Sequence, residues 1–157
     1  MRDPKLPVAS EHDEQVALFD WAKLMIGHLP EIALLFAVPN GARTSIHTAK
    51  KLKAEGLRAG VPDVWFPVAR GQYHGMVIEM KRCMGGQLSR EQKGWIEALR
   101  KQGYYVVVCP GWDLARQEIE QYLKLVTFMK LPLNQLCLMV LLLSLCLVNK
   151  ACSTSLK

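Results

Sequence analysis

The sequence predicts an α/β domain in which a small mixed sheet is flanked by helices, with elements in the order αβαββαβα. Apolar residues recur at helical spacing in the first segment, capping residues mark further helices, and short apolar runs typical of strands lie between them. Gly and Pro residues mark the boundaries of these segments. The chain has 157 residues, half of them apolar and 22% charged, which fits one folded domain and excludes a disordered protein.

Two predicted helices with a strand between them begin the domain. The first helix covers 11–27, because Ser10 and Asp13 resemble a capping box and apolar residues then recur at helical spacing. The continuous apolar run 32–38 predicts a buried strand. A second, basic helix is predicted at 45–56, with a glycine at its end.

Three strands and two helices follow. The strands are predicted at 63–68, 76–81 and 104–109, and the helices at 89–103 and 113–124. The connection between the first two of these strands contains two glycines and has the length of a hairpin loop. Ser89 and Gln92 form a capping box for the first of the two helices, and Asp113 is the predicted N-cap of the second.

The composition changes abruptly after residue 124. Positions 125–157 contain three of the 20 basic residues and no Asp or Glu, so the net charge of +6 divides evenly between this segment and the rest. The run 131–149 has no charged residue and is close to the length that spans a bilayer. We therefore expect an N-terminal arm at 1–9, a folded domain at 10–124 and an apolar, Leu-rich tail. Three interpretations of the tail stay open: a helix packed on the domain or on a second copy, a membrane anchor, or an extension without a role.

The start of the chain and its cysteines indicate the compartment. The first ten residues contain charges and two prolines but no apolar stretch of the kind found in secretory signals, so we expect a cytoplasmic protein. Five cysteines without a Cys-x-x-Cys pair exclude a zinc ribbon and argue against a disulfide scaffold. The basic charge is compatible with a polyanionic partner such as nucleic acid.

Charged residues in the predicted hairpin indicate the chemistry. Side chains alternate across a strand, so Glu79 and Lys81 project from one face and Met80 from the other. If the two strands pair, Asp63 lies beside both at the edge of the sheet. Two neighbouring carboxylates repel each other, and a hard cation such as Mg²⁺ relieves the repulsion. Such an ion can polarise a phosphoryl oxygen and activate a water molecule, which is the minimum apparatus for hydrolysing a phosphodiester. The structural alternative is a turn aspartate and a solvated ion pair.

Several short motifs occur together in the order found in a known nuclease family. They are Glu11-His12-Asp13-Glu14-Gln15, Pro39-Asn40-Gly41, Gly56-x3-Gly60-Val61-Pro62-Asp63, Ile78-Glu79-Met80-Lys81 and Gly86-Gln87-Leu88-Ser89-x2-Gln92. Over residues 10–110 the chain resembles the VRR-NUC nuclease domain, a branch of the PD-(D/E)xK superfamily found in phages, bacteria and DNA-repair enzymes. The resemblance implies a restriction-endonuclease-like core and cleavage of DNA with Mg²⁺ or Mn²⁺, often at branched or flapped sites. It also implies the cytoplasm of a bacterial cell or a phage-infected host, and such nucleases can form homodimers.

The resemblance assigns roles to individual residues. Asp63 and Glu79 would be metal ligands, and Lys81 would be the catalytic lysine. The acid on the first helix maps to Glu14 or Glu11, which lie three residues apart on one helix face. We favour Glu14.

Gln92 and a basic cluster complete the candidate residues. Gln92 matches the family's glutamine on the helix after the Glu-x-Lys motif, although its place in a capping box already explains it. Contacts with the nucleic-acid backbone are predicted for Arg43, Lys50, Lys51, Lys53, Arg58 and Arg82. Nothing resembles a base-reading helix or finger, so we expect selectivity for DNA structure rather than sequence. A non-catalytic nucleic-acid-binding module on the same scaffold is the alternative from another functional class.

Overall fold

The computed structural model describes residues 8–39 and 46–126. By its internal contacts the chain divides into two units, Met1–Thr127 and Phe128–Lys157, and every described residue belongs to the first. The elements are α1 (Glu11–Met25), the 3-10 helix η1 (Pro30–Leu34), β1 (Phe36–Ala37), α2 (Ile46–Ala54), β2 (Val64–Phe66), β3 (Met76–Lys81), α3 (Arg90–Lys101), β4 (Tyr105–Pro110) and α4 (Trp112–Leu123). The predicted order αβαββαβα is confirmed.

The sheet is mixed, with strand order β1-β2-β3-β4. β2 lies antiparallel to both β1 and β3, and β4 lies parallel to β3. β2 and β3 form the predicted hairpin pair, in which Val64 is opposite Ile78 and Phe66 is opposite Met76. Because β4 occupies the other side of β3, that strand is central and buried along its whole length. The sequence-based prediction that its charged end lies at the sheet edge is therefore wrong.

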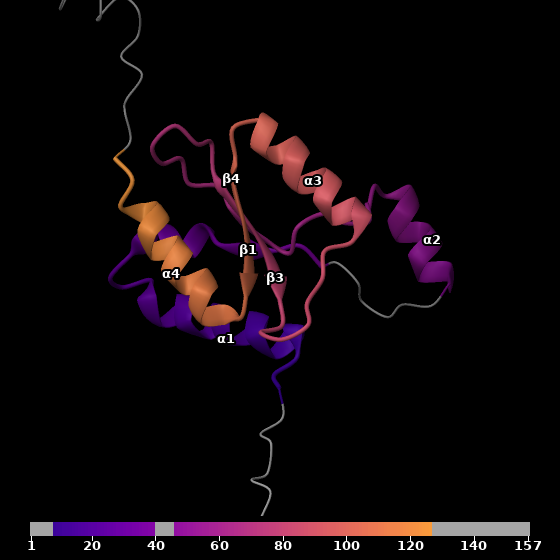
Figure 1. The fold of residues 1–157 in the computed structure, drawn as a ribbon, viewed down its shortest axis with the longest axis horizontal. Coiled ribbons are helices and arrows are strands. Elements are labelled where there is room, and N and C mark those ends of the chain that lie inside the picture. Colours follow the sequence, from indigo (N-terminus) through magenta and orange to yellow (C-terminus); the bar gives the residue numbers. More distant parts are fainter. Residues whose placement is uncertain (1–7, 40–45, 127–157) are drawn as a thin grey trace, which may run out of the picture. The chain divides into compact units, whose positions relative to one another are not determined.

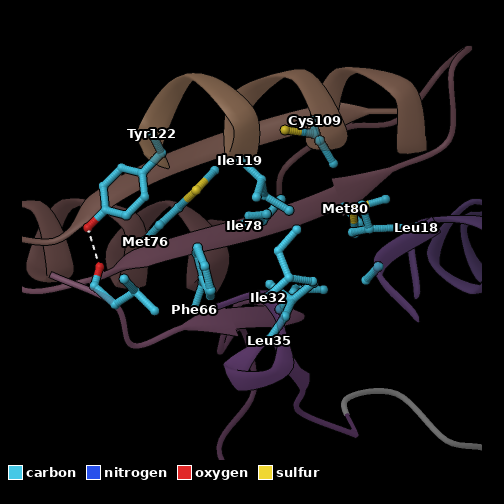
Figure 2. Packing of buried hydrophobic residues seen from close by; sticks show 14 residues of the cluster. Leu18, Ile32, Leu35, Phe66, Met76, Ile78, Met80, Cys109, Ile119 and Tyr122 are labelled. Atoms are coloured by element: carbon cyan, nitrogen blue, oxygen red, sulfur yellow. Dashed lines mark hydrogen bonds between the residues drawn. The ribbon is translucent and has the colours of Figure 1, made fainter. Parts of the chain in front are cut away.

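Helices cover both faces of the sheet (Figure 1). α1 and α4 pack on one face and contact each other, whereas α3 packs on the other face against β4. Side-chain alternation along β3 serves both layers, since Met76, Ile78 and Met80 belong to the core beneath α1 and α4. Figure 2 shows these three residues among Leu18 of α1 and Ile119 of α4. Glu79 and Lys81 project from the opposite side of β3. That side faces α3.

Most of the apolar run 32–38 does not form the predicted strand. The 3-10 helix η1 takes its first part, and only Phe36 and Ala37 form strand β1. Pro30 begins the 3-10 helix, and the buried side chains that follow are Ile32 and Leu35, which are 2% and 8% exposed. Their spacing of three residues matches the three residues per turn of a 3-10 helix. Leu34 and Phe36 are about half exposed, so the run is not buried on all sides.

The predicted capping boxes are both present, whereas the predicted N-cap of the last helix is wrong. Ser10 with Asp13 caps α1, and Ser89 with Gln92 caps α3. The N-cap of α4 is Gly111, which has no side chain to accept a hydrogen bond. Asp113 lies in the first turn of α4 and accepts hydrogen bonds from neighbours on the same helix. A carboxylate from α1 instead accepts the first amide hydrogen bond of α4.

Within the described residues, no helix is long and apolar enough to cross a membrane. The run 131–149, on which the anchor interpretation depends, lies outside those residues, as do most of the predicted arm and tail.

Candidate active site

The charged end of β3 is the centre of the candidate site. Glu79 is fully buried and the Lys81 side chain is 8% exposed. The Lys81 ammonium lies 2.6 Å from Glu79 Oε1 and 2.7 Å from the carbonyl oxygen of Met80. As predicted, Glu79 and Lys81 project from the same face of the strand. Gly86 packs against the Lys81 side chain so closely that a Cβ there would lie 2.9 Å from Lys81 Cβ.

Asp63 joins the site from the start of β2. Its Oδ2 accepts a hydrogen bond of 3.0 Å from the backbone amide of Met80, which places its carboxylate beside Glu79 and Lys81. The backbone on both sides of Asp63 is held locally, because Asp63 O accepts a hydrogen bond from Val38 N and Pro62 O accepts one from Trp65 Nε1. The hairpin thus brings together the three residues that the sequence predicted to meet.

Gln92 contacts the site while it caps α3. Its Oε1 accepts a hydrogen bond of 2.9 Å from the amide of Ser89, and its Nε2 donates a short hydrogen bond to Glu79 Oε1. The two interpretations of Gln92 therefore describe one geometry, in which the cap orients the amide toward Glu79. Gly60 permits this approach, since it has φ +82° and a Cβ there would lie 2.6 Å from the backbone of Glu91.

Burial makes the site electrostatically unusual. Burial raises the pKa of Glu79 to about 7, and the nearby Asp63 carboxylate adds to the rise, against the hydrogen bond from Lys81. Burial also raises the pKa of Asp63, although its hydrogen bond from Met80 opposes the effect. Burial lowers the pKa of Lys81, but the hydrogen bond and charge of Glu79 outweigh it, so the net shift is upward. These shifts favour the charged form of Lys81 and disfavour ionisation of Asp63 and Glu79.

One oxygen of the site has no protein partner. Among the described residues, Glu79 Oε2 is the buried side-chain oxygen that makes no hydrogen bond. An unpartnered carboxylate oxygen beside a second carboxylate suits a hard cation, which binds oxygen ligands. In the described part of the chain, no group of three or more His, Cys, Asp or Glu side chains is arranged closely enough to hold a metal ion. The chemistry of the donors fits a divalent metal with Asp63 and Glu79 as ligands.

The two candidate acids of α1 have different surroundings. Glu11 Oε2 lies 3.3 Å from Lys81 Nζ, so Glu11 is the residue of α1 that reaches the site. Glu14 is 6% exposed and points toward the start of α4, where Oε2 accepts a hydrogen bond of 2.8 Å from the amide of Trp112. Its Oε1 accepts a hydrogen bond from the Cys83 thiol. Within the described residues, Glu14 forms no hydrogen bond or ion pair with Asp63, Glu79 or Lys81.

The chain is similar to a known protein family and to a solved structure. The sequence profile of the VRR-NUC domain matches residues 15–113, which include Asp63, Glu79, Lys81 and Gln92. The chain belongs to the VRR-NUC family. A solved structure described as a VRR_NUC domain protein is 31% identical, with a TM-score of 0.62, over 75% of this chain and 91% of its own. No curated protein matches the chain. These two matches confirm the resemblance found in the sequence. The VRR-NUC family consists of PD-(D/E)xK-type nucleases.

A cavity adjoins the candidate site on the side of α1. It has a volume of about 600 Å³ and is lined by Glu11, His12, Gln15, Ala37, Val38, Pro39 and Asp63. Gln15, the last residue of the first motif, is thus part of the lining of this cavity. Glu11 and Asp63 both contribute to the lining of this cavity.

The predicted nucleic-acid contacts that the structure describes are exposed side chains without an ion pair to the candidate site. Lys50, Lys51, Lys53, Arg58 and Arg82 are all exposed. Within the described residues, none of them forms an ion pair with Asp63, Glu79 or Glu11. Figure 1 shows that α2, which carries the three lysines, stands apart from the sheet. Arg43 lies outside the described residues.

Sequence reasoning missed the junction behind the site. Glu14, Cys83 and the turn at Gly111 meet there, although they are far apart along the chain. No pattern in the sequence indicates that the Glu14 side chain would cap the helix that follows Gly111.

Proposed function

We propose that this VRR-NUC protein is a metal-dependent endonuclease that hydrolyses phosphodiester bonds in DNA, with Mg²⁺ as its cofactor and Mn²⁺ as a substitute. The observation that carries the proposal is the buried carboxylate of Glu79, whose Oε2 has no protein partner beside Asp63 and Lys81. A structural ion pair would not require a second, half-buried carboxylate or an unpartnered oxygen. Such a costly arrangement is typical of a site that binds a ligand.

Each residue of the cluster has a chemical role in this proposal. Asp63 and Glu79 would hold the cation, and a bound cation would polarise a phosphoryl oxygen and make a coordinated water more acidic. Lys81 remains charged and offsets the negative charge that develops on the phosphate. Gln92 holds Glu79 in place by its hydrogen bond to Oε1, which leaves Oε2 for the metal.

We assign the acid of the first helix to Glu11 rather than to Glu14. Glu11 lies 3.3 Å from the Lys81 ammonium and lines the cavity beside Asp63. Both oxygens of Glu14 already accept hydrogen bonds from other parts of the protein. Glu11 is thus the acid of α1 that can approach the metal or the attacking water.

The substrate is proposed to be DNA with branched or flapped structure. The exposed lysines of α2, with Arg58 and Arg82, supply positive charge for the phosphate backbone. Backbone contacts position nucleic acid without reading its sequence, which supports selectivity for structure. A homodimer and a cytoplasmic location in bacteria or phage-infected cells belong to the same proposal.

A cleavage assay with the full chain tests the proposal. Labelled linear, flap and four-way-junction DNA, and an RNA duplex, are each incubated with Mg²⁺, with Mn²⁺ or with a chelator. We expect DNA cleavage that requires the metal and that Asp63→Asn reduces at least about 100-fold. Asp20→Asn is the matched control, because Asp20 is an exposed residue of α1 paired with Lys23, and it should stay within about twofold of the wild type.

The assay also separates the alternatives. Cleavage by Asp63→Asn at the wild-type rate would exclude the assigned site. Salt-dependent DNA binding without products in either metal would favour the non-catalytic nucleic-acid-binding module. Cleavage of RNA alone would retain the chemistry and change the substrate.

A further inference from the structure

We propose that Glu14 is a positioning residue that ties α1 to the turn behind the catalytic strand and so sets Glu11 against Lys81. The inference rests on the proposed nuclease function and deepens it. It gives a buried acid of α1 a role distinct from that of a metal ligand.

The first observation is the environment of the Glu14 carboxylate. Glu14 is 6% exposed, and a buried carboxylate is costly unless its oxygens are bonded. Both oxygens are bonded here: Oε2 accepts from Trp112 N at 2.8 Å, and Oε1 accepts from Cys83 Sγ at 3.1 Å. These donors belong to α4 and to the segment after β3, so one side chain joins three elements.

The second observation is the need of α4 for an external cap. The first amides of a helix have no partner within the helix, and its N-terminus carries a partial positive charge. Gly111 occupies the N-cap and offers no side chain. The carboxylate of Glu14 satisfies the Trp112 amide in its place, with a negative charge at the favourable end of the helix.

The third observation links this junction to the catalytic lysine. The amide of Gly111 donates a hydrogen bond of 2.8 Å to the carbonyl oxygen of Lys81. The junction is tightly packed, because a Cβ at Gly111 would lie 2.7 Å from Cys83 Sγ and 3.5 Å from Glu14 Oε2. The turn that Glu14 binds is therefore the turn that holds the backbone of Lys81.

The geometry of α1 transmits this restraint to Glu11. Residues 11 and 14 lie one turn apart on the same helix face. The capping box of Ser10 and Asp13 stabilises the first turn of α1, to which Glu11 belongs, so the backbone of Glu11 is held with the helix. When Glu14 is bound to Trp112, Glu11 Oε2 lies 3.3 Å from Lys81 Nζ.

Four variants of the full chain test the assignment in the DNA cleavage assay. Glu14→Gln keeps an oxygen that can accept the Trp112 amide, whereas Glu14→Ala removes it. Glu11→Gln removes the charge of the proposed catalytic acid, and Glu97→Ala, an exposed position on α3, is the control for loss of a glutamate. The measurements are kcat, KM for DNA and the hydrogen-exchange rate of the Trp112 amide.

We expect Glu14→Gln to retain kcat within about threefold, because the neutral side-chain oxygen can still accept the hydrogen bond from the Trp112 amide. Glu14→Ala should lower kcat at least about tenfold with little change in KM, since a small displacement of a catalytic group is costly. The Trp112 amide should exchange at least about tenfold faster in Glu14→Ala than in Glu14→Gln or the wild type. Glu11→Gln should lose activity with normal Trp112 exchange.

Three outcomes would overturn the assignment. Equal inactivity of Glu14→Gln and Glu11→Gln would mean that the charge of Glu14 itself is required, as for a metal ligand. A wild-type kcat in Glu14→Ala would mean that the hydrogen bond between Glu14 and Trp112 does not position the site. A Trp112 amide that exchanges freely in the wild type would mean the same. By contrast, a wild type that cleaves no substrate overturns the proposed function, which this assay shows separately.

Discussion

Glu79 places a carboxylate where a folded protein ordinarily has an apolar side chain. An unsatisfied buried oxygen costs about 1–3 kcal/mol, and Glu79 Oε2 is such an oxygen. Lys81 and Gln92 offset part of this cost through Oε1, but neither reaches Oε2. Glu79 therefore destabilises the fold, and a cation bound to Oε2 would offset this cost.

Cys109 on β4 predicts how stability depends on pH. Burial, with the nearby charge of Glu118, raises the pKa of this thiol from 9.0 to about 12. Because the folded-state pKa exceeds the unfolded-state value, the stability from the neutral thiol is complete below pH 9 and is lost as pH rises toward 12. Between pH 8 and pH 10.5 this group should cost the wild type about 2 kcal/mol.

The measurement is the free energy of unfolding in denaturant, under reducing conditions, at both pH values. Cys109→Ala should lose about 2 kcal/mol less than the wild type over this interval. Val106→Ala is the matched control, because Val106 is buried on the same strand and has no titratable group. An identical pH dependence in the wild type and Cys109→Ala would contradict the prediction.

At the scale of the element, local patterns account for most of the helices and for the hairpin. The capping boxes of α1 and α3 and the alternation of Glu79, Met80 and Lys81 depend on residues two or three positions apart. Such spacings are visible in the sequence. The run 32–38 was misread because a continuous apolar segment does not reveal its period, and Pro30 starts a 3-10 helix there.

The lysines of α2 carry a prediction about nucleic-acid binding. Lys50, Lys51 and Lys53 are exposed on one short helix, and each phosphate contact contributes about 0.9 to the slope of log affinity against log salt concentration. Replacing all three by alanine should weaken DNA binding and reduce this slope by up to about 2.7. The binding is measured with a chelator present, so that no cleavage occurs.

A second triple variant provides the control for charge. Lys23, Lys101 and Lys124 are also exposed but lie on α1 or at the ends of α3 and α4. Their replacement by alanine removes the same charge and should leave the slope nearly unchanged. If both triple variants reduce the slope equally, α2 is not a specific binding element.

At the scale of the whole molecule, the site depends on close approaches between distant segments. Gly60 brings the segment before β2 against the first turn of α3, where Gln92 reaches Glu79. Gly111 brings the turn before α4 against Cys83 and Glu14. At both positions a Cβ would be closer than 3 Å to a neighbouring atom.

Gly60→Ala and Gly56→Ala separate crowding from backbone strain. Both glycines have positive φ, but a Cβ at Gly56 meets nothing within 4 Å, whereas at Gly60 it lies 2.6 Å from the Glu91 backbone. Gly56→Ala should cost about 1–2 kcal/mol in free energy of unfolding, from strain alone. Gly60→Ala should cost at least about 3 kcal/mol, because α3 must also move.

Denaturant unfolding measures both losses, and the cleavage assay adds a second measurement. Gly60→Ala should also lower activity, since the shift of α3 draws Gln92 away from Glu79. Equal losses of stability in the two variants would indicate that the contact between Gly60 and α3 does not support the fold.

By itself, the sequence determined the order of the elements, the hairpin, and the meeting of Asp63, Glu79 and Lys81. These features follow from periods and turns that involve only a few neighbouring residues. Only the tertiary structure decided that β4 pairs with β3 and makes it a central strand, and that Glu11 rather than Glu14 approaches Lys81. Glu11 and Glu14 share one helix face, so their different partners depend on a contact between residues 14 and 112, which lie 98 positions apart. Packing across such a distance leaves no local pattern, because the residues that meet are chosen by how whole elements fit together.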